Sequence, residues 1–472
     1  MRLVNRFSLL ASAALIVLPG IASAQTVTNL AVLRGLAPFS QLLGSPAGKA
    51  ALAANYRITG EIQAGNAHQA LLLAFPAQQQ LWLKDAFITG SDAANLSDGL
   101  GTTIGGAYLA LASYSSNDDG ATYSFTSITP SFAQLIAYTT SLTEADAGAG
   151  KYFFANGTID GSTPASSAAY PLMLGGSVAV FDRAYPHPNA GGKACTVIKN
   201  ERGDSRPLLT LEALNVFKAD DYFGVQHSSL DYLCGPSDNE QKSPSFPSGH
   251  STYAYTESLL LGYMIPERFP QMVVRAGEYG NDRIVLGAHY AMDIIAGRTL
   301  TFFDMAHLLA NDPVYLGLKL QGHDSISAPE APLDDYQAAL SAAQNDVRQA
   351  LETKLGTGIA VAAADDQSRF KDAARNTAFY EQTLTYGLPV VYPTQAVHTE
   401  DVLKLAPEAG YLLTTAYPQL SLRQADAILT ATEAAGGGFL DNGSEFGIYS
   451  RLDLYKAALK AQALIAAETK KK

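Results

Sequence analysis

The sequence predicts an all-α fold, because helical patterns occur towards both ends of the chain. Apolar residues recur at mixed helical spacing over residues 47–62 and 68–88. Ser421 and Gln424 have the spacing of a capping box, which indicates a helix that runs to about Thr432. An amphipathic stripe is formed by Leu333, Tyr336, Leu340, Val347 and Leu351.

The remaining stretches give weaker patterns. Residues 114–129 are rich in Ser, Thr and Tyr and favour a loop or a short hairpin. A last helix is predicted over residues 452–467. Trp82, the one tryptophan, lies in a helix-like run, so we expect it in the core rather than in a binding surface.

The domain organisation is predicted from the positions of the residues that could take part in catalysis or binding. A chain of 472 residues suggests one large domain or two ordinary ones. The chemical motifs fall between residues 199 and 293, so we predict a helical catalytic domain over 25–312. The remainder, 313–472, is predicted to be a helical C-terminal extension packed on that domain. A role for it in homo-oligomer formation stays open.

The first 24 residues have the pattern of a secretory signal. Arg2 and Arg6 give a basic start, residues 9–18 are apolar, and residues 22–24 are small, so cleavage is expected after Ala24. A membrane anchor is the alternative, but the apolar run is short for a span. No later stretch is long and apolar enough to cross a membrane. We therefore expect a periplasmic or secreted protein.

The charge balance limits the partners. Removal of Arg2 and Arg6 from the 32 Lys+Arg leaves 30 against 44 Asp+Glu, a net charge of −14. Such an acidic surface argues against nucleic acid as a partner. Any binding of an anion must therefore depend on a local basic pocket.

The chain has two cysteines, Cys195 and Cys234. An even pair in an exported protein predicts a disulfide bond, with two buried free thiols as the alternative. On the chain-entropy model, the closed loop of about 40 residues would stabilise the fold by ~4 kcal/mol. The bridge would also restrain Lys199 and Arg206, which lie within this loop.

Three cationic side chains are candidates for binding a phosphate-sized anion. Lys199, Arg206 and Arg283 supply positive charge, and the two arginines add fork-shaped donors. Pro207 disfavours helical geometry at Arg206, so a helix end or an extended approach is expected there.

The second motif is the tetrapeptide Pro247–His250. Pro247 prevents a helix from continuing upstream, and Ser248 is a good N-cap for a helix over residues 250–264. The backbone N–H groups of Ser248 and Gly249 would then point at an anion. His250, the last residue of the motif, is a candidate catalytic residue.

The third motif combines Arg283 with His289 and Asp293. His289 and Asp293 are four residues apart, so on a helix they would share a face and could form a hydrogen bond. Arg283 would point away from His289 in one unbroken helix. We therefore predict that one helix ends near Leu286 and that another begins near Ala288.

These motifs together resemble the three-part signature of the type 2 phosphatidic acid phosphatase superfamily. That superfamily includes lipid phosphatases, bacterial class A acid phosphatases and vanadate-dependent haloperoxidases. The soluble bacterial acid phosphatases are the most similar branch, through residues 266–268, 278–280 and 287–290. In one departure, Asp282 stands before Arg283, where the family usually has Ser.

The resemblance implies a helical bundle of the acid phosphatase/vanadium haloperoxidase type and a small phosphorylated substrate. It implies that His289 is the nucleophile, that Asp293 orients it, and that His250 is the general acid. No metal or other cofactor is expected: His227 and His307 are interpreted as structural or surface residues, because no cluster has metal-ligand spacing.

Two other functions stay open at this point. A vanadate-dependent haloperoxidase would hold vanadate in the same pocket, with His289 as the protein ligand of the metal. A non-enzymatic anion-binding protein would use the cations but would not need two histidines and an orienting aspartate.

Overall fold

The all-α prediction is confirmed in the part of the chain that the structure describes. The computed structural model describes residues 39–66, 71–86, 93–116, 123–125, 127–140, 205–233, 245–316 and 333–470. Within them, the only sheets are two antiparallel pairs, β1 (Tyr114–Ser116) with β2 (Tyr123–Phe125) and β3 (Lys218–Asp220) with β4 (Gln226–Ser228). The first pair confirms the hairpin expected within 114–129.

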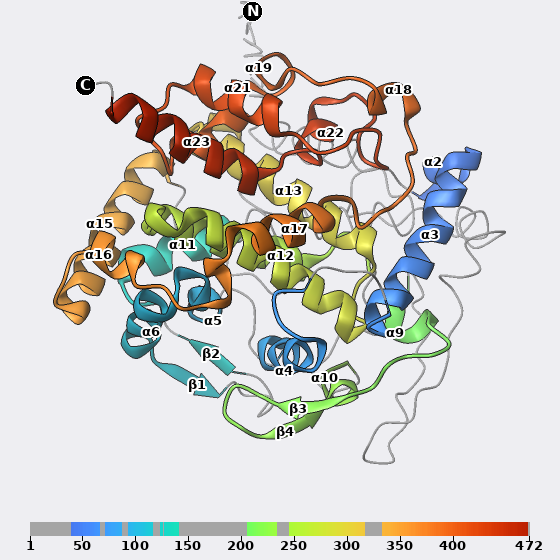
Figure 1. Ribbon diagram of the computed structural model, residues 1–472, viewed down its shortest axis with the longest axis horizontal. Coiled ribbons are helices and arrows are strands. Elements are labelled where there is room, and N and C mark those ends of the chain that lie inside the picture. Colours follow the sequence, from blue (N-terminus) through green and yellow to red (C-terminus); the bar gives the residue numbers. More distant parts are fainter. Residues whose placement is uncertain are drawn as a thin grey trace, which may run out of the picture.

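The N-terminal helices run along the right-hand side and the lower part of the molecule in Figure 1. They are α2 (Phe39–Leu43), α3 (Pro46–Gln63), α4 (Phe75–Ala86), α5 (Ala93–Leu96), the 3-10 helix η1 (Ser97–Leu100) and α6 (Thr102–Leu111). Ser45 caps α3 by accepting from the Gly48 amide at 2.9 Å. The helix predicted over 68–88 begins only at Phe75, because Pro76 is tolerated in a first turn but not further inside a helix. Trp82 is fully buried, as expected.

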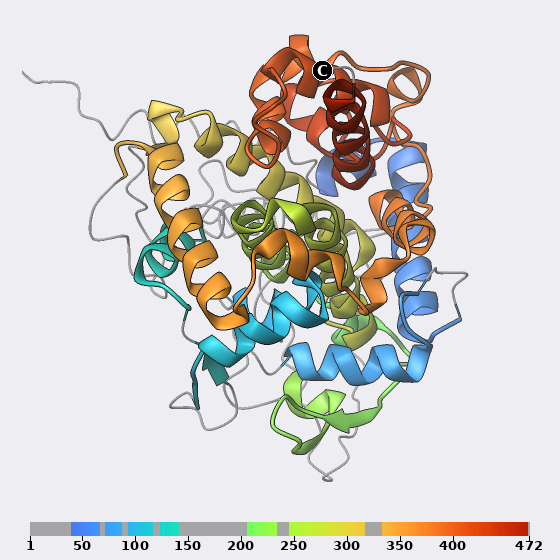
Figure 2. The same ribbon diagram turned by 60° about the vertical axis from the view of Figure 1, so that its left-hand side comes forward.

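The central layer carries the three chemical motifs. Its elements are α9 (Pro207–Thr210), α10 (Ser229–Leu233), α11 (Gly249–Met264), the 3-10 helix η3 (Pro266–Arg268), α12 (Phe269–Leu286), α13 (Ala291–Leu309) and α14 (Pro313–Leu316). The three long helices α11, α12 and α13 occupy the middle of the molecule in both views (Figures 1 and 2). Nearly all of their side chains are buried, so they form a scaffold without a solvent-facing side.

Much of the C-terminal part lies above the central helices in Figure 1, and its first two helices lie to their left. It contains α15 (Tyr336–Leu355), α16 (Ile359–Ala364), η4 (Arg369–Lys371), α17 (Ala373–Thr385), α18 (Pro393–Ala396), α19 (Val402–Leu405), η5 (Pro407–Gly410), α20 (Tyr411–Thr414), α21 (Leu422–Thr432), α22 (Glu445–Tyr449) and α23 (Leu454–Thr469). The Ser421–Gln424 capping box is present, and the predicted apolar stripe is the buried face of α15.

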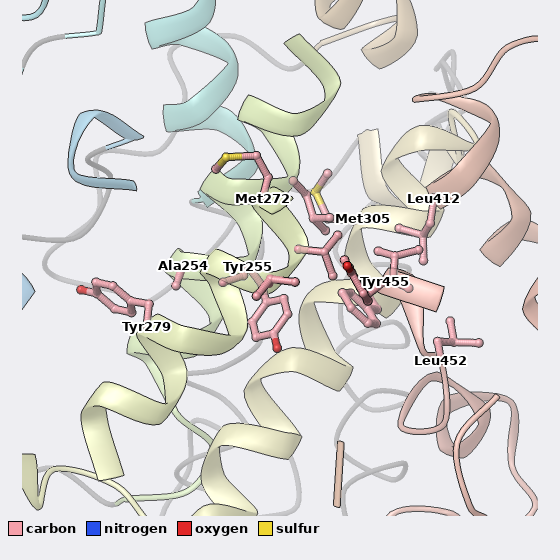
Figure 3. Close-up of a cluster of buried hydrophobic side chains, with 14 of the residues drawn as sticks. Ala254, Tyr255, Met272, Tyr279, Met305, Leu412, Leu452 and Tyr455 are labelled. Atoms are coloured by element: carbon pink, nitrogen blue, oxygen red, sulfur yellow. The ribbon is translucent and has the colours of Figure 1, made fainter. Parts of the chain in front are cut away.

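The C-terminal helices share one hydrophobic core with the central ones. Figure 3 shows Tyr255, Met272 and Met305 in one cluster with Leu412, Leu452 and Tyr455. Polar contacts add to this packing. The guanidinium of Arg298, on α13, donates to the carbonyls of Thr383, Leu384 and Ser450 at 3.0–3.1 Å. The extension is therefore tied to the helix that carries Asp293.

Among the described helices, none combines the length and the apolar character needed to cross a bilayer. The predicted signal sequence, residues 1–24, lies outside the described residues.

Candidate active site

Two histidines from different motifs meet at the start of two central helices. His250 lies in the first turn of α11, and His289 lies just before α13. The Nδ1 atom of His250 is 3.1 Å from Nε2 of His289, and the two rings are arranged edge to face. His289 is fully buried, whereas His250 is partly exposed. The pair is therefore reachable from the His250 side.

A carboxylate lies beside the other ring nitrogen of His289. The Oδ2 atom of Asp293 lies 3.3 Å from Nδ1 of His289 and accepts from the Tyr290 amide at 2.8 Å. The Ser245 hydroxyl donates to the same oxygen. Three groups thus converge on one carboxylate oxygen and fix its position.

The prediction that His289 and Asp293 share a helix was wrong. The helix α12 ends at Leu286, as predicted, with Gly287 in a left-handed conformation at φ 81°. However, α13 begins at Ala291, so His289 precedes it. The contact forms because Asp293 is the third residue of α13 and reaches back in a capping box.

Arg206 approaches the same histidine from the first motif. It is the N-cap of α9 with an extended backbone, φ −70° and ψ 159°, as expected for a residue before proline. Its Nη1 atom lies 3.0 Å from Nε2 of His289 and donates to the Ala288 carbonyl at 3.2 Å. A permanent positive charge therefore lies at the ring nitrogen that faces His250.

The start of α11 is attached directly to the start of α13. Ser248 is the N-cap, as predicted, and its Oγ accepts from the Ser251 amide at 3.1 Å. The Ser248 amide donates to the Asp293 carbonyl at 3.0 Å, so this donor is already engaged. Gly297 allows the close approach, because a Cβ there would lie 2.5 Å from the Ser248 carbonyl oxygen.

Arg283 is a buried cation, and some of its guanidinium donors make no hydrogen bond to a described residue. Its Nη2 atom donates to the Asp85 carbonyl at 3.2 Å, and its guanidinium carbon lies 4.1 Å from the centre of the Tyr279 ring. Nε and Nη1 make no hydrogen bond to any described residue. Burial alone would lower the pKa of Arg283, but Tyr279, Tyr232 and Asp85 raise it overall, so the side chain stays charged.

Residues 194–310 match the family model of the PAP2 superfamily. This segment belongs to that superfamily. It contains every catalytic and phosphate-binding residue that the sequence predicts, so the recognition of the family is confirmed.

Curated proteins that are similar to the chain have names that include acid phosphatase. The non-specific acid phosphatase of Salmonella typhi is 36% identical over 77 residues, 16% of this chain and 31% of the relative. The acid phosphatase of Zymomonas mobilis is 35% identical over 78 residues, 16% of this chain and 30% of the relative. The non-specific acid phosphatase of Providencia stuartii is 26% identical over 148 residues, 30% of this chain and 57% of the relative.

The chain thus spans less than two thirds of the length of each of these relatives. No solved structure matches the chain at a significant level.

Asp282, which departs from the usual PAP2 motif, is a buried carboxyl group. The side chain is fully buried, and neither oxygen makes a hydrogen bond to a described residue. Nη1 of Arg275 lies 4.0 Å from its Oδ2 atom. Burial, together with the carboxylates of Asp85 and Glu278, raises the pKa of Asp282 well above its usual range. The protonated form of Asp282 is therefore favoured in the folded protein.

Sequence reasoning missed two polar residues of the PAP2 site. The hydroxyl of Tyr232 lies 3.1 Å from Nε2 of His250, and its ring centre lies 5.9 Å from the guanidinium carbon of Arg283. Ser245 contacts Asp293, as described above. Tyr232 has no distinctive spacing to the other motifs, whereas the position of Ser245 two residues before Pro247 could have suggested a role.

Three of the predicted residues lie outside the described part of the chain. They are Lys199 and the cysteines Cys195 and Cys234. The disulfide bond and the lysine contact to an anion therefore remain predictions.

Proposed function

We propose that the protein is an acid phosphatase that hydrolyses small phosphate monoesters through a phosphohistidine intermediate. One observation carries the proposal. Nε2 of His289 faces a cation and a second histidine, while its Nδ1 faces the carboxylate of Asp293. This is the arrangement of a nucleophile with an orienting base partner.

The phosphoryl group would bind between Arg206 and the start of α11. Arg206 offers its guanidinium beside His289, and the amide of Gly249 is the first N–H of the helix itself. The unengaged Nε and Nη1 donors of Arg283 add to this set. We propose that Lys199 is a further member of this set of phosphate-binding groups. Together these groups stabilise the negative charge that develops on the transferred phosphoryl oxygens.

In the first step, Nε2 of His289 attacks phosphorus and the bond to the ester oxygen breaks. His250 gives its proton to that oxygen, so the alcohol leaves in neutral form. Asp293 stabilises the positive imidazole ring that is now bound to phosphorus. The products of this step are the alcohol and phospho-His289.

In the second step, water attacks the phosphohistidine. His250, now neutral, accepts the proton of the water, and the bond between phosphorus and Nε2 breaks. Inorganic phosphate leaves, and both histidines return to their starting states. Because His250 must begin protonated and its reference pKa is ~6.5, we expect an acidic pH optimum.

We propose that fixed arginine and lysine charges supply the electrostatic stabilisation, without a catalytic metal. We also propose that the protein is exported, with the signal cleaved after Ala24. The names of the relatives, each an acid phosphatase, support phosphate ester hydrolysis over vanadate-dependent halide oxidation.

The proposal is tested by hydrolysis of a generic aryl phosphate at pH 5–6 with a chelator present. Turnover that survives chelation supports it. Absence of turnover, together with halide oxidation after addition of vanadate and peroxide, would assign the pocket to a haloperoxidase instead.

A further inference from the structure

A group of one histidine and two carboxylate side chains lies at the opposite end of α13 from the histidine pair. It consists of His307 on α13, Glu408 on η5 and Glu445 at the start of α22, here called the His307 cluster. One ligand-type atom from each residue lies within 4.8 Å of the others. The three residues come from three separate chain segments, so the fold and not local sequence brings them together.

The ring of His307 is held in one orientation. Its Nδ1 atom lies 2.9 Å from Oδ2 of Asp312. The ring also stacks on Tyr315, with centroids 4.7 Å apart, and meets Phe303 edge to face at 4.6 Å. A carboxylate at Nδ1 favours the tautomer in which Nδ1 carries the proton and Nε2 keeps its lone pair.

The Nε2 atom of His307 lies near carboxylates, and no described donor is within hydrogen-bond distance of it. Its Nε2 atom is buried and makes no hydrogen bond to any described residue. The nearest carboxylate oxygen, Oε1 of Glu408, is 3.9 Å away, beyond hydrogen-bond distance. Glu408 is itself fixed, because the Tyr449 hydroxyl donates to it. A lone pair and two carboxylates that face one another repel unless a positive charge lies between them.

We propose that the His307 cluster binds a divalent metal ion of the zinc type. One imidazole nitrogen and two carboxylate oxygens form a ligand set that suits zinc, whereas magnesium and calcium prefer oxygen alone. Tetrahedral zinc, with ligand distances near 2.0–2.2 Å, needs ligand atoms roughly 3.3 Å apart, so small side-chain movements suffice. Asp312 supplies the outer carboxylate that commonly orients a metal-bound histidine.

The ion would have a structural role. It would join the end of α13 to η5 and α22, and so fasten the C-terminal part to the central layer. Asp293 and His307 are separated by 14 positions on α13, about 21 Å along the axis. Removal of the ion should therefore weaken the fold without removing a group from the histidine pair. This inference does not depend on the proposed phosphatase activity.

The test is zinc titration of the metal-stripped full chain, with calorimetry to count sites. Glu445→Gln is the main variant, because Glu445 is exposed and its replacement should not prevent folding. Glu408→Gln tests the second carboxylate. Glu468→Gln, an exposed position on α23, is the matched control. We expect one zinc per chain in the unmodified protein and in the control, with at least tenfold weaker binding in the two cluster variants.

Thermal unfolding gives an independent readout. Zinc at roughly 100 times its dissociation constant should raise Tm by about 3 °C in the unmodified chain, and much less in Glu445→Gln. The inference is overturned if no zinc binds, or if zinc binds with the same affinity to both cluster variants. The second result would point to another site, such as the histidine pair.

Discussion

The Nδ1 atom of His250 lies 3.1 Å from Nε2 of His289, yet the two rings have different partners on their far sides. The far nitrogen of His289 faces the Asp293 carboxylate, whereas that of His250 faces the Tyr232 hydroxyl. A carboxylate stabilises a ring that gains positive charge, and a neutral hydroxyl does so less. This difference supports His289 as the nucleophile and His250 as the proton donor.

Replacement of His289 by alanine should abolish turnover while phosphate binding stays detectable. The fall in kcat should be at least about 10³-fold, because no other described side chain occupies the nucleophile position. The matched control is His398→Ala, at an exposed position in the C-terminal part. Phosphate binding can be followed by calorimetry. Substantial turnover in the His289→Ala protein would show that another group attacks phosphorus.

Tyr232→Phe should lower kcat by about tenfold with little change in KM, the loss expected for one hydrogen bond. The hydroxyl holds the His250 ring rather than the substrate, so the effect should appear in the chemical step. Tyr114→Phe, whose side chain is 58% exposed, is the control. Steady-state kinetics across pH 4–8 give the readout. An equal kcat for both variants would remove Tyr232 from the account.

Asp282→Asn should make stability less sensitive to pH. The pKa of Asp282 is raised in the folded state, so the native protein holds this proton more tightly than the unfolded chain does. The resulting stabilisation is present at low pH and is lost as pH rises above the unfolded pKa of ~3.9 towards the folded one. The asparagine variant has no carboxyl group at this position, so its stability does not fall with pH for this reason.

The difference in unfolding free energy between the Asp282→Asn variant and the unmodified protein should therefore grow in favour of the variant. Its slope should be up to about 1.4 kcal/mol per pH unit over that window. Urea unfolding at several pH values measures it. A difference that does not change with pH would mean that the carboxyl group of Asp282 titrates alike in both states.

Arg369→Met should destabilise the fold by about 3 kcal/mol, because it leaves a buried carboxylate short of a partner. Arg369, on η4, donates through Nε to both oxygens of Glu278 on α12, at 2.9 and 3.1 Å. Glu278 is fully buried. Denaturant unfolding monitored by circular dichroism provides the measurement.

The control for this change is Arg57→Met, which removes an exposed pair with Glu61 one helical turn away. Exposed pairs of this kind contribute about 0.3–0.5 kcal/mol. If the two methionine variants lost equal stability, the buried pair would not anchor the C-terminal part.

The sequence predicted the helices best where caps and breaks are local. Ser248, Ser421 and Gly287 each determine a helix boundary through their own backbone or side chain, and all three boundaries were correct. The start of α13 was predicted three residues early. It depends on Asp293 folding back onto the Tyr290 amide, and spacing alone does not distinguish this from a helix that already includes His289.

Long-range contacts could not be predicted in the same way. Tyr232 reaches His250 from a separate helix, and no repeat or spacing in the sequence connects them. The sequence shows no metal-ligand spacing around His307, because Glu408 and Glu445 are distant from it along the chain. The raised pKa of Asp282 likewise depends on its burial and on Asp85, which is contributed by α4.

The most direct test of the phosphohistidine mechanism is to trap the intermediate. The full chain is mixed with a labelled aryl phosphate, quenched in base, digested and analysed by mass spectrometry. The mechanism predicts a phosphoryl group on His289, absent from the His289→Ala protein and accumulating when water attack is slowed in His250→Ala. Turnover with no label on His289, under conditions that preserve phosphohistidine, would contradict it.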